Sequence, residues 1–212
     1  MMKKLNKKAL ILTSIVTLLP ILLGLSFYSE LPSRIAIHWS VNNEPNGWAS
    51  RSYFVFGLPI LMMVLNVVCH IGTAIRRNPD EPLPKAIRIN FWIIPILTVF
   101  LYIVTLYIAL GNELDIRKVV CLILGVLFII MGNYMPKVSY NNRHMVNTLV
   151  RFDNDHAWRI YMRIMGITFI SGGALILITL LLPPIATVLA IAIFFGLLIG
   201  ISFYGASVAL RK

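Results

Sequence analysis

Few side chains in this sequence could transfer protons or bind a metal. One candidate group consists of Asp153, Asp155 and His156, which lie close together in the sequence. Two aspartates with one histidine are a poor metal signature. A carboxylate at the start of a helix is stabilised by the helix dipole by about 0.3 to 1 kcal/mol. We therefore expect Asp153 or Asn154 to cap a helix here, rather than the group to act on a substrate.

A second pair of carboxylates, Glu113 and Asp115, stands in a short polar turn. No nucleophile or metal ligand is close in the sequence, so attraction of these carboxylates to Arg117 or Lys118 is a better explanation than paired acid–base chemistry. The sequence therefore predicts no catalytic residue, no metal site and no cofactor. The alternative is a membrane-embedded enzyme, a hydrolase acting on a lipid or a peptide.

Two polar side chains, Asn66 and His70, interrupt an apolar stretch. Polar groups at membrane depth generally face the interior of a helix bundle and sometimes relay protons or line a transport path. We favour a histidine that bonds a neighbouring carbonyl over a proton relay, and we keep both residues as weak intramembrane candidates. A small membrane carrier that uses them is an alternative function.

The elements that must position these side chains are membrane helices. Of the 212 residues, 58% are apolar and 13% are charged, and the mean hydropathy is +0.84, whereas soluble domains carry roughly 25% charged residues. Six apolar stretches are long enough to span a bilayer, at about 9–28, 53–75, 91–110, 119–134, 164–182 and 185–210. We predict an all-α membrane protein, a polytopic bundle of six transmembrane helices whose first span is not a cleaved signal peptide.

The longest polar segment of the first half, residues 30–52, separates the first two spans. Residues 34–41 alternate between apolar and polar positions, which predicts a strand, and the Pro, Gly and Asn residues of 42–47 predict a turn. Tryptophan favours the level of the lipid headgroups. We expect an extracellular strand-turn loop that binds a ligand through His38, Trp39, Glu44, Pro45, Gly47 and Trp48.

The positive charge of the chain is distributed unevenly. If the N-terminus is cytoplasmic, fifteen of the 19 Lys and Arg residues lie in inner segments, as the positive-inside rule requires. We therefore place both termini in the cytoplasm of a bacterium and the protein in its plasma membrane. The net charge of +11 is then explained by attraction to anionic membrane lipids rather than by nucleic-acid binding.

Further expectations concern organisation. We draw two domains, 1–88 with the 30–52 loop and 89–212 with a 135–163 cytoplasmic loop. Cys69 and Cys121 lie at different depths, so we expect free thiols. The glycines of the last two spans, Gly172, Gly173, Gly196 and Gly200, suit close helix packing within the bundle, with a homodimer as the lesser alternative.

Two motifs carry a resemblance. The first runs through the 30–52 loop as Leu31, Pro32, Ile37, His38 and Trp39, followed by Glu44, Pro45 and Gly47. The second is the segment Gly132, Asn133, Tyr134, Met135, Pro136, Lys137 and Val138, with the pair Trp158 and Arg159 following 22 residues after the proline. Together they resemble the SdpI family, bacterial membrane proteins that protect a producer cell from its own secreted peptide toxin, including the N-terminal domain of unknown function of that family.

The resemblance implies an immunity or peptide-sensing protein that recognises a secreted peptide toxin outside and signals to a cytoplasmic transcriptional repressor. The implied signalling residues are Asn133, Tyr134, Pro136, Lys137, Thr148, Trp158 and Arg159. The chain departs from the family at 145–152, where a Gly-Ile-Arg-Thr-Pro-Trp-Thr-Leu segment is common and only Thr148 is kept. Immunity depends less on this segment than signalling does.

Overall fold

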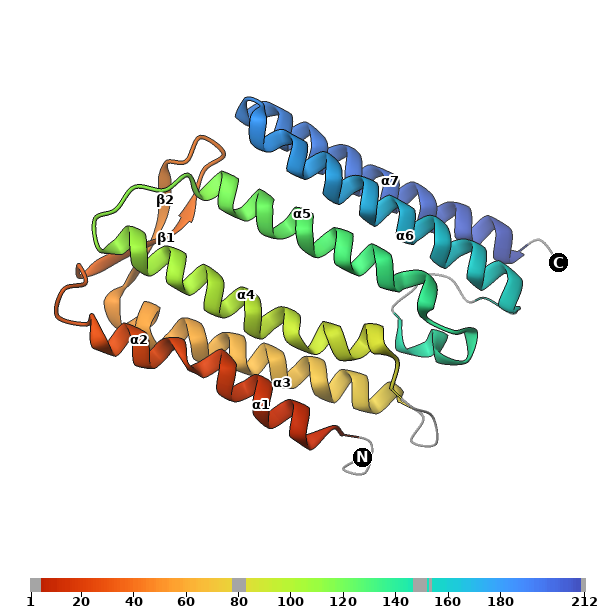
Figure 1. Cartoon of the computed structure of the whole chain (residues 1–212), viewed down its shortest axis with the longest axis horizontal. Coiled ribbons are helices and arrows are strands. Elements are labelled where there is room, and N and C mark those ends of the chain that lie inside the picture. Colours follow the sequence, from red (N-terminus) through yellow and green to blue (C-terminus); the bar gives the residue numbers. More distant parts are fainter. Residues whose placement is uncertain (1–4, 78–82, 147–151, 153, 211–212) are drawn as a thin grey trace. The chain divides into compact units, whose positions relative to one another are not determined.

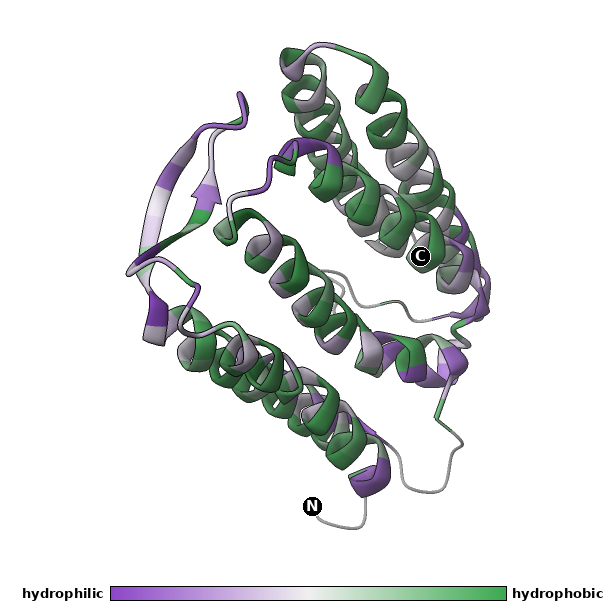
Figure 2. Ribbon diagram, turned by 60° about the vertical axis from the view of Figure 1, so that its left-hand side comes forward, coloured by the Kyte–Doolittle hydropathy of each residue, from purple (hydrophilic) through white to green (hydrophobic). Residues whose placement is uncertain are grey.

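The structure is a computed structural model of the chain and describes residues 5–77, 83–146, 152 and 154–210. Among these residues, six helices are long and apolar enough to cross a membrane (Figures 1 and 2). They are Lys7–Ser26, Tyr53–Arg76, Lys85–Ala109, Ile116–Lys137, Asp155–Leu181 and Pro184–Tyr204. Each has at least 20 residues, enough for about 30 Å of hydrocarbon. The predicted all-α, six-helix membrane architecture is confirmed.

The chain divides into two compact units. The first comprises Met1–Leu83 and Ile87–Leu114, and the second Pro84–Ala86 and Asp115–Lys212. In sequence the first unit holds α1 (Lys7–Leu18), α2 (Pro20–Ser26), β1 (Arg34–Trp39), β2 (Pro45–Ser50), α3 (Leu58–Arg76) and most of α4 (Lys85–Ala109), and the second holds α5 (Ile116–Tyr134), α6 (Asp155–Ile178) and α7 (Pro184–Leu210). The boundary at 88/89 drawn from the sequence falls within α4 and stays a prediction about domains.

The first span is a helix interrupted at Leu19. Pro20 has no backbone N–H to donate, so the helix stops and restarts as α1 and α2. Leu19 still donates to the carbonyl of Ile15 at 3.0 Å. The second span also begins irregularly, with the π-helical turn η1 (Tyr53–Gly57) ahead of α3.

Strands β1 and β2 form an antiparallel hairpin between the first two spans. The strand predicted from residue 34 is confirmed as far as Trp39. The predicted strict alternation of faces is wrong beyond Ala36, because the pairing passes over Ile37 between Ala36 and His38. This β-bulge adds an unpaired residue and turns the strand, so that Ala36 is buried and Ile37 is exposed.

The second unit is built on close contact between α5 and α6. A Cβ atom at Gly132 would collide with the carbonyl oxygen of Gly166, and one at Gly125 would collide with Leu177 of the α6 segment. Glycines let two helix backbones approach in this way. The predicted packing role is confirmed for Gly172 and Gly173, which face Phe194 of α7 and the carbonyl oxygen of Gly125.

The same prediction is wrong for the two glycines of α7. No described atom lies within 4 Å of a Cβ built at Gly196 or at Gly200. The homodimer stays a prediction.

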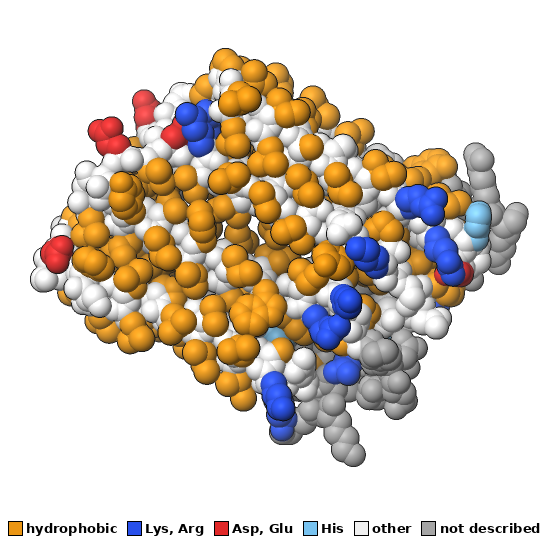
Figure 3. All heavy atoms as spheres, viewed as in Figure 1, with side chains coloured by type: hydrophobic (Ala, Val, Ile, Leu, Met, Phe, Trp, Pro, Cys, Tyr) orange, Lys and Arg blue, Asp and Glu red, His pale blue; other side chains and the backbone are white. Residues whose placement is uncertain are grey.

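Figure 3 shows apolar side chains over the exposed helix faces, with Lys and Arg at the helix ends, as expected of helices surrounded by lipid.

Candidate functional site

The hairpin holds all six of the loop residues predicted to bind a ligand. Two pairs face each other in its register, His38 with Gly47 and Trp39 with Pro45. The ring Nδ1 of His38 also bonds the side-chain oxygen of Asn46. A Cβ at Gly47 would lie 2.7 Å from the Cβ of His38, so glycine leaves room for this histidine to lie across the strand pair.

The hairpin turns through Ser40 to Glu44. The Ser40 N–H donates to the Glu44 carbonyl at 2.8 Å, and the Asn43 N–H donates to the Ser40 carbonyl at 3.0 Å. Asn43 adopts a φ of 67°, a left-handed conformation that asparagine tolerates better than most residues. The predicted turn is therefore confirmed at Asn42 and Asn43 as a hydrogen-bonded structure, but its extension to residue 47 is wrong, because Pro45 and Gly47 belong to β2.

Three large apolar side chains of this hairpin are exposed. Trp48 is 50% exposed, Val41 is 41% exposed and Ile37 is 38% exposed. Glu44, which lies between Val41 and Trp48 in the sequence, is also exposed. An indole with an apolar body and one N–H donor binds at interfaces where one side is apolar and the other wet. The hairpin therefore presents the chemistry that an amphipathic ligand needs.

The base of the hairpin is fixed to the core of the first unit. Leu31 and Ile35 are buried against Phe54, Tyr102 and Leu106. The ring of Tyr102 stacks on Phe54 with centroids 4.4 Å apart. The exposed side chains Trp48, Val41 and Ile37 therefore belong to a hairpin whose base is packed into the core of the first unit.

The root has a polar component as well. Arg51 donates from Nε to the carbonyl of Pro32 at 3.3 Å, and its guanidinium lies 5.2 Å from the ring centroid of Tyr28. Its backbone N–H donates to the carbonyl of Ser33 at 3.1 Å. Both ends of the hairpin are thus held together where they join the helices.

Asn66 and His70, the two intramembrane candidates, meet inside the first unit at Thr13. The Thr13 hydroxyl oxygen accepts from Asn66 Nδ2 at 3.0 Å and lies 3.1 Å from His70 Nε2. The expectation of a backbone carbonyl partner for His70 is wrong, because the threonine of α1 occupies that position. The His70 ring also stacks on the ring of Phe91, with the two ring centroids 3.9 Å apart. The cluster joins α1 to α3 by buried polar contacts.

The second candidate region is a cap on the second unit, which we call the aromatic cap and define by Val138, Phe152, Ala157, Trp158, Tyr161 and Met162. Trp158 is fully buried and its indole N–H donates to the Val138 carbonyl at 2.8 Å. The Tyr140 hydroxyl donates to the Phe152 carbonyl at 3.0 Å. Aromatic residues near the start of a membrane helix are usually interfacial anchors, but Trp158 and Tyr161 are both buried in this cluster.

The other predicted signalling residues surround the cap. Lys137 lies over the ring of Tyr134, 4.4 Å from its centroid, and Asn133 is exposed. Pro136 packs against Gly166, where a Cβ would lie 3.0 Å from its ring. Thr148 lies outside the described residues.

The start of α6 confirms the capping interpretation. The Asn154 side-chain oxygen accepts the Ala157 N–H at 2.8 Å, so Asn154 is the cap and Asp153 lies outside the described residues. Asp155 pairs with Arg159 at 2.6 Å, one turn along an exposed helix face. His156 is exposed, and the described residues contain no cluster of three metal-ligating side chains.

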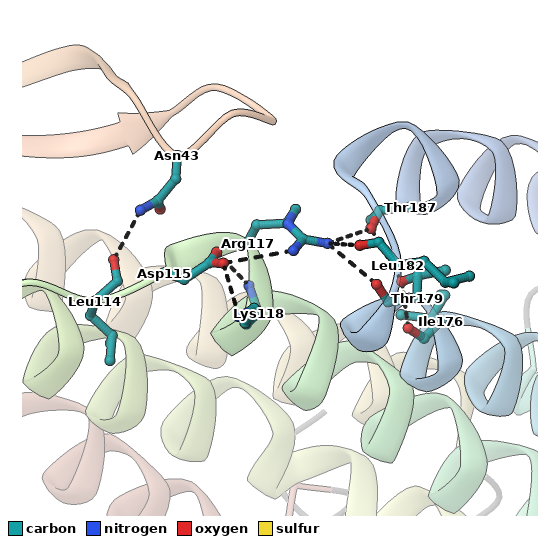
Figure 4. A network of polar contacts seen from close by, with 9 residues as sticks. All are labelled: Asn43, Leu114, Asp115, Arg117, Lys118, Ile176, Thr179, Leu182 and Thr187. Atoms are coloured by element: carbon teal, nitrogen blue, oxygen red, sulfur yellow. Dashed lines mark hydrogen bonds and ion pairs between the residues drawn. The ribbon is translucent and has the colours of Figure 1, made fainter.

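Arg117 has a role that the sequence did not reveal. Its side chain is only 10% exposed. Within the second unit it donates to the carbonyls of Thr179 and Leu182 at 3.3 and 3.4 Å and to the Thr187 hydroxyl at 3.2 Å (Figure 4). The predicted attraction to Asp115 is confirmed at 3.7 Å. The turn between α6 and α7 is thus bound to the start of α5.

The chain resembles known proteins in two comparisons. Residues 15–63, which include the hairpin, match a domain of unknown function, DUF1648. The chain is 26% identical over 192 residues to the immunity protein SdpI of Bacillus subtilis (strain 168), which covers 85% of this chain and 91% of that protein. No solved structure matches the chain. The resemblance to the SdpI family inferred from the sequence is confirmed, and with the six apolar helices it supports a multi-pass membrane immunity protein.

Proposed function

We propose that the protein confers resistance to a secreted peptide toxin by binding it at the hairpin on the outer face of the bacterial plasma membrane. The observation that carries the proposal is the exposure of Trp48, Val41 and Ile37 on a hairpin whose base is buried in the core of the first unit. A peptide held there is kept from entering the bilayer. No catalytic step is required.

The proposal needs the hairpin outside and both termini inside. The distribution of Lys and Arg supports this orientation. With six crossings, the hairpin follows the first span and the aromatic cap follows the fourth, so the two lie on opposite faces of the membrane. The cap then faces the cytoplasm.

The ligand chemistry follows from the surface. Exposed Trp48 offers an apolar face and an N–H donor, and exposed Glu44 carries a carboxylate. Tryptophan faces also attract Lys and Arg side chains. A cationic amphipathic peptide fits this combination, and binding buries apolar surface at about 25 cal/mol per Å² before the cost of association.

Signalling to a cytoplasmic repressor is the second half of the proposal. The aromatic cap supports it as a folded surface that carries exposed Asn133, Lys137 and Arg159. The departure at 145–152 lies in the segment that joins Val138 to Ala157 and includes the cap residue Phe152, so it concerns the signalling half. Immunity therefore stands independently of the repressor.

The test is protection of a toxin-sensitive bacterium that expresses the chain and is exposed to the secreted toxin of an SdpI-type producer. We expect Trp48→Ala and a His38→Ala, Trp39→Ala double variant to lose about tenfold or more in protection, the loss that follows from removing an aromatic contact of about 1.4 kcal/mol. Phe195→Ala on α7, at a side chain 53% exposed, is the matched control. If the hairpin variants protect the cells as well as the wild-type protein does, the proposal is contradicted.

The same strains test orientation. A membrane-impermeant thiol reagent should label a cysteine placed at exposed Asn42 in intact cells and spare one at exposed His144. Cys69→Ser and Cys121→Ser remove the native thiols first. The reverse labelling pattern would put the hairpin in the cytoplasm and end the recognition model.

A further inference from the structure

We propose that Asn43 latches the tip of the hairpin to the connection between α4 and α5, and that a peptide on the hairpin is sensed by the second unit through this latch. The inference rests on the proposed function, because it assigns a regulatory link to the same recognition site. It makes Asn43 a positioning residue and not part of the ligand-binding surface.

The first step is the geometry of Asn43. Its left-handed φ of 67° and its N–H bond to the Ser40 carbonyl fix the backbone. With the backbone fixed, the side chain reaches out of the turn, and Nδ2 donates to the carbonyl of Leu114 at 3.2 Å (Figure 4). The bond joins positions 71 residues apart in the chain.

The second step is what Leu114 adjoins. The next residue, Asp115, is the N-cap of α5, and its side chain accepts the Lys118 N–H at 3.1 Å. The Asp115 carbonyl accepts the Val119 N–H at 3.2 Å. A displaced Leu114 carbonyl therefore acts, across one peptide bond, on the residue that starts the helix.

The connection itself transmits such a displacement because it is short and held at its other end. Gly111 takes a φ of 91°, and the Asn112 side chain donates to the Tyr107 carbonyl at 2.9 Å. The Gly111 conformation and the Asn112 bond give the C-terminal end of α4 a defined conformation. The connection therefore has little slack in which to absorb a movement of Leu114.

The third step lies within the second unit. Arg117, in the first turn of α5, donates to the carbonyls of Thr179 and Leu182 and pairs with Asp115. A change at the Asp115 cap therefore reaches the turn between α6 and α7 through one side chain. The far end of α6 carries Trp158, the centre of the aromatic cap.

The latch is closed when Asn43 donates to the Leu114 carbonyl and open when this bond is broken. A bound peptide can shift the equilibrium between these two states only if it binds one of them more tightly. Val41 and Glu44 flank Asn42 and Asn43 in the sequence and are exposed, so a peptide that contacts both lies against the turn that carries Asn43. The peptide then displaces the Asn43 side chain sterically and separates Nδ2 from the Leu114 carbonyl. We therefore expect binding to open the latch.

The test uses the full-length protein in nanodiscs of phosphatidylethanolamine and phosphatidylglycerol. Asn43→Gly retains the left-handed backbone and removes the amide, and Asn42→Ala is the matched control on the same turn. Hydrogen–deuterium exchange of the Lys118 and Val119 amides is the measurement. We expect a rise of about fivefold in Asn43→Gly, the factor set by one net hydrogen bond, and none in Asn42→Ala.

The second arm adds the synthetic secreted toxin of an SdpI-type producer and follows binding by the change in the protein's tryptophan fluorescence. Wild type should show faster exchange at 116–119 on binding, whereas Asn43→Gly should bind and show no further rise. Equal exchange in Asn43→Gly and wild type overturns the latch. If the peptide leaves the fluorescence unchanged, the proposed function and the sensing step both fail, while the ligand-free exchange still decides whether Asn43 holds α5.

Discussion

The strongest structural prediction concerns Trp158. Replacing it with Phe keeps most of its apolar volume but removes the N–H that donates to the Val138 carbonyl at 2.8 Å. Leaving a buried carbonyl without its donor costs about 1 to 3 kcal/mol. We therefore expect Trp158→Phe to lower the free energy of unfolding by about 2 kcal/mol, and Trp158→Ala by about 3 to 5 kcal/mol because it also leaves a cavity.

The assay is unfolding by sodium dodecyl sulfate in mixed micelles, followed by far-ultraviolet circular dichroism so that loss of an indole does not alter the signal. Trp48→Phe is the matched control, because Trp48 is 50% exposed and surface changes usually stay within about 0.5 kcal/mol. If Trp158→Phe unfolds at the same detergent fraction as Trp48→Phe, Trp158 is a lipid anchor and the aromatic cap is not a packed cluster.

Two further substitutions test the second unit. Gly132→Ala should destabilise by about 1 to 3 kcal/mol, because its Cβ would meet the Gly166 carbonyl oxygen; Gly196→Ala, with no described atom within 4 Å, should be neutral or slightly stabilising in the same titration. Arg117→Met should cost about 1.5 to 3 kcal/mol, since three acceptors lose a charged donor; an Arg117→Lys variant as unstable as Arg117→Met would mean that charge contributes nothing there.

The membrane architecture was predictable because hydropathy is a property of the chain in one dimension. A run of about 20 apolar residues must form a helix in lipid, since no other open structure satisfies its backbone. The hairpin turn was predictable at Asn42 and Asn43 for a similar reason, because asparagine favours turn conformations locally, whereas Pro45 and Gly47 lie in β2. Asn154 as the cap of α6 is the same kind of local rule.

The failures share a different cause. The bulge at Ile37 depends on the register of β2, which the alternation within 34–41 does not contain. Trp158 near a helix start has the same sequence signature whether it faces headgroups or a folded cap. Arg117 bonds carbonyls 62 and 65 residues away. Each of these required knowing which distant segment lies opposite, and a single sequence does not specify partners.

The two motifs that resemble the SdpI family have different physical roles in this chain. In the second motif, Gly132 permits the close approach of α5 and α6, Pro136 packs on Gly166, and Trp158 satisfies the Val138 carbonyl. These residues are buried or packed, so their substitution should lower stability and thereby lower protection indirectly.

The hairpin motif behaves in the opposite way. Leu31 is buried in its base, but His38, Glu44 and Pro45 are exposed, so substituting them removes little buried packing. Loss of protection without loss of stability should therefore be found among hairpin variants and not among cap variants. Comparing Trp48→Ala with Trp158→Phe for both properties separates the two roles, and a Trp48→Ala protein that loses protection only because it unfolds would refute the assignment of the hairpin to recognition.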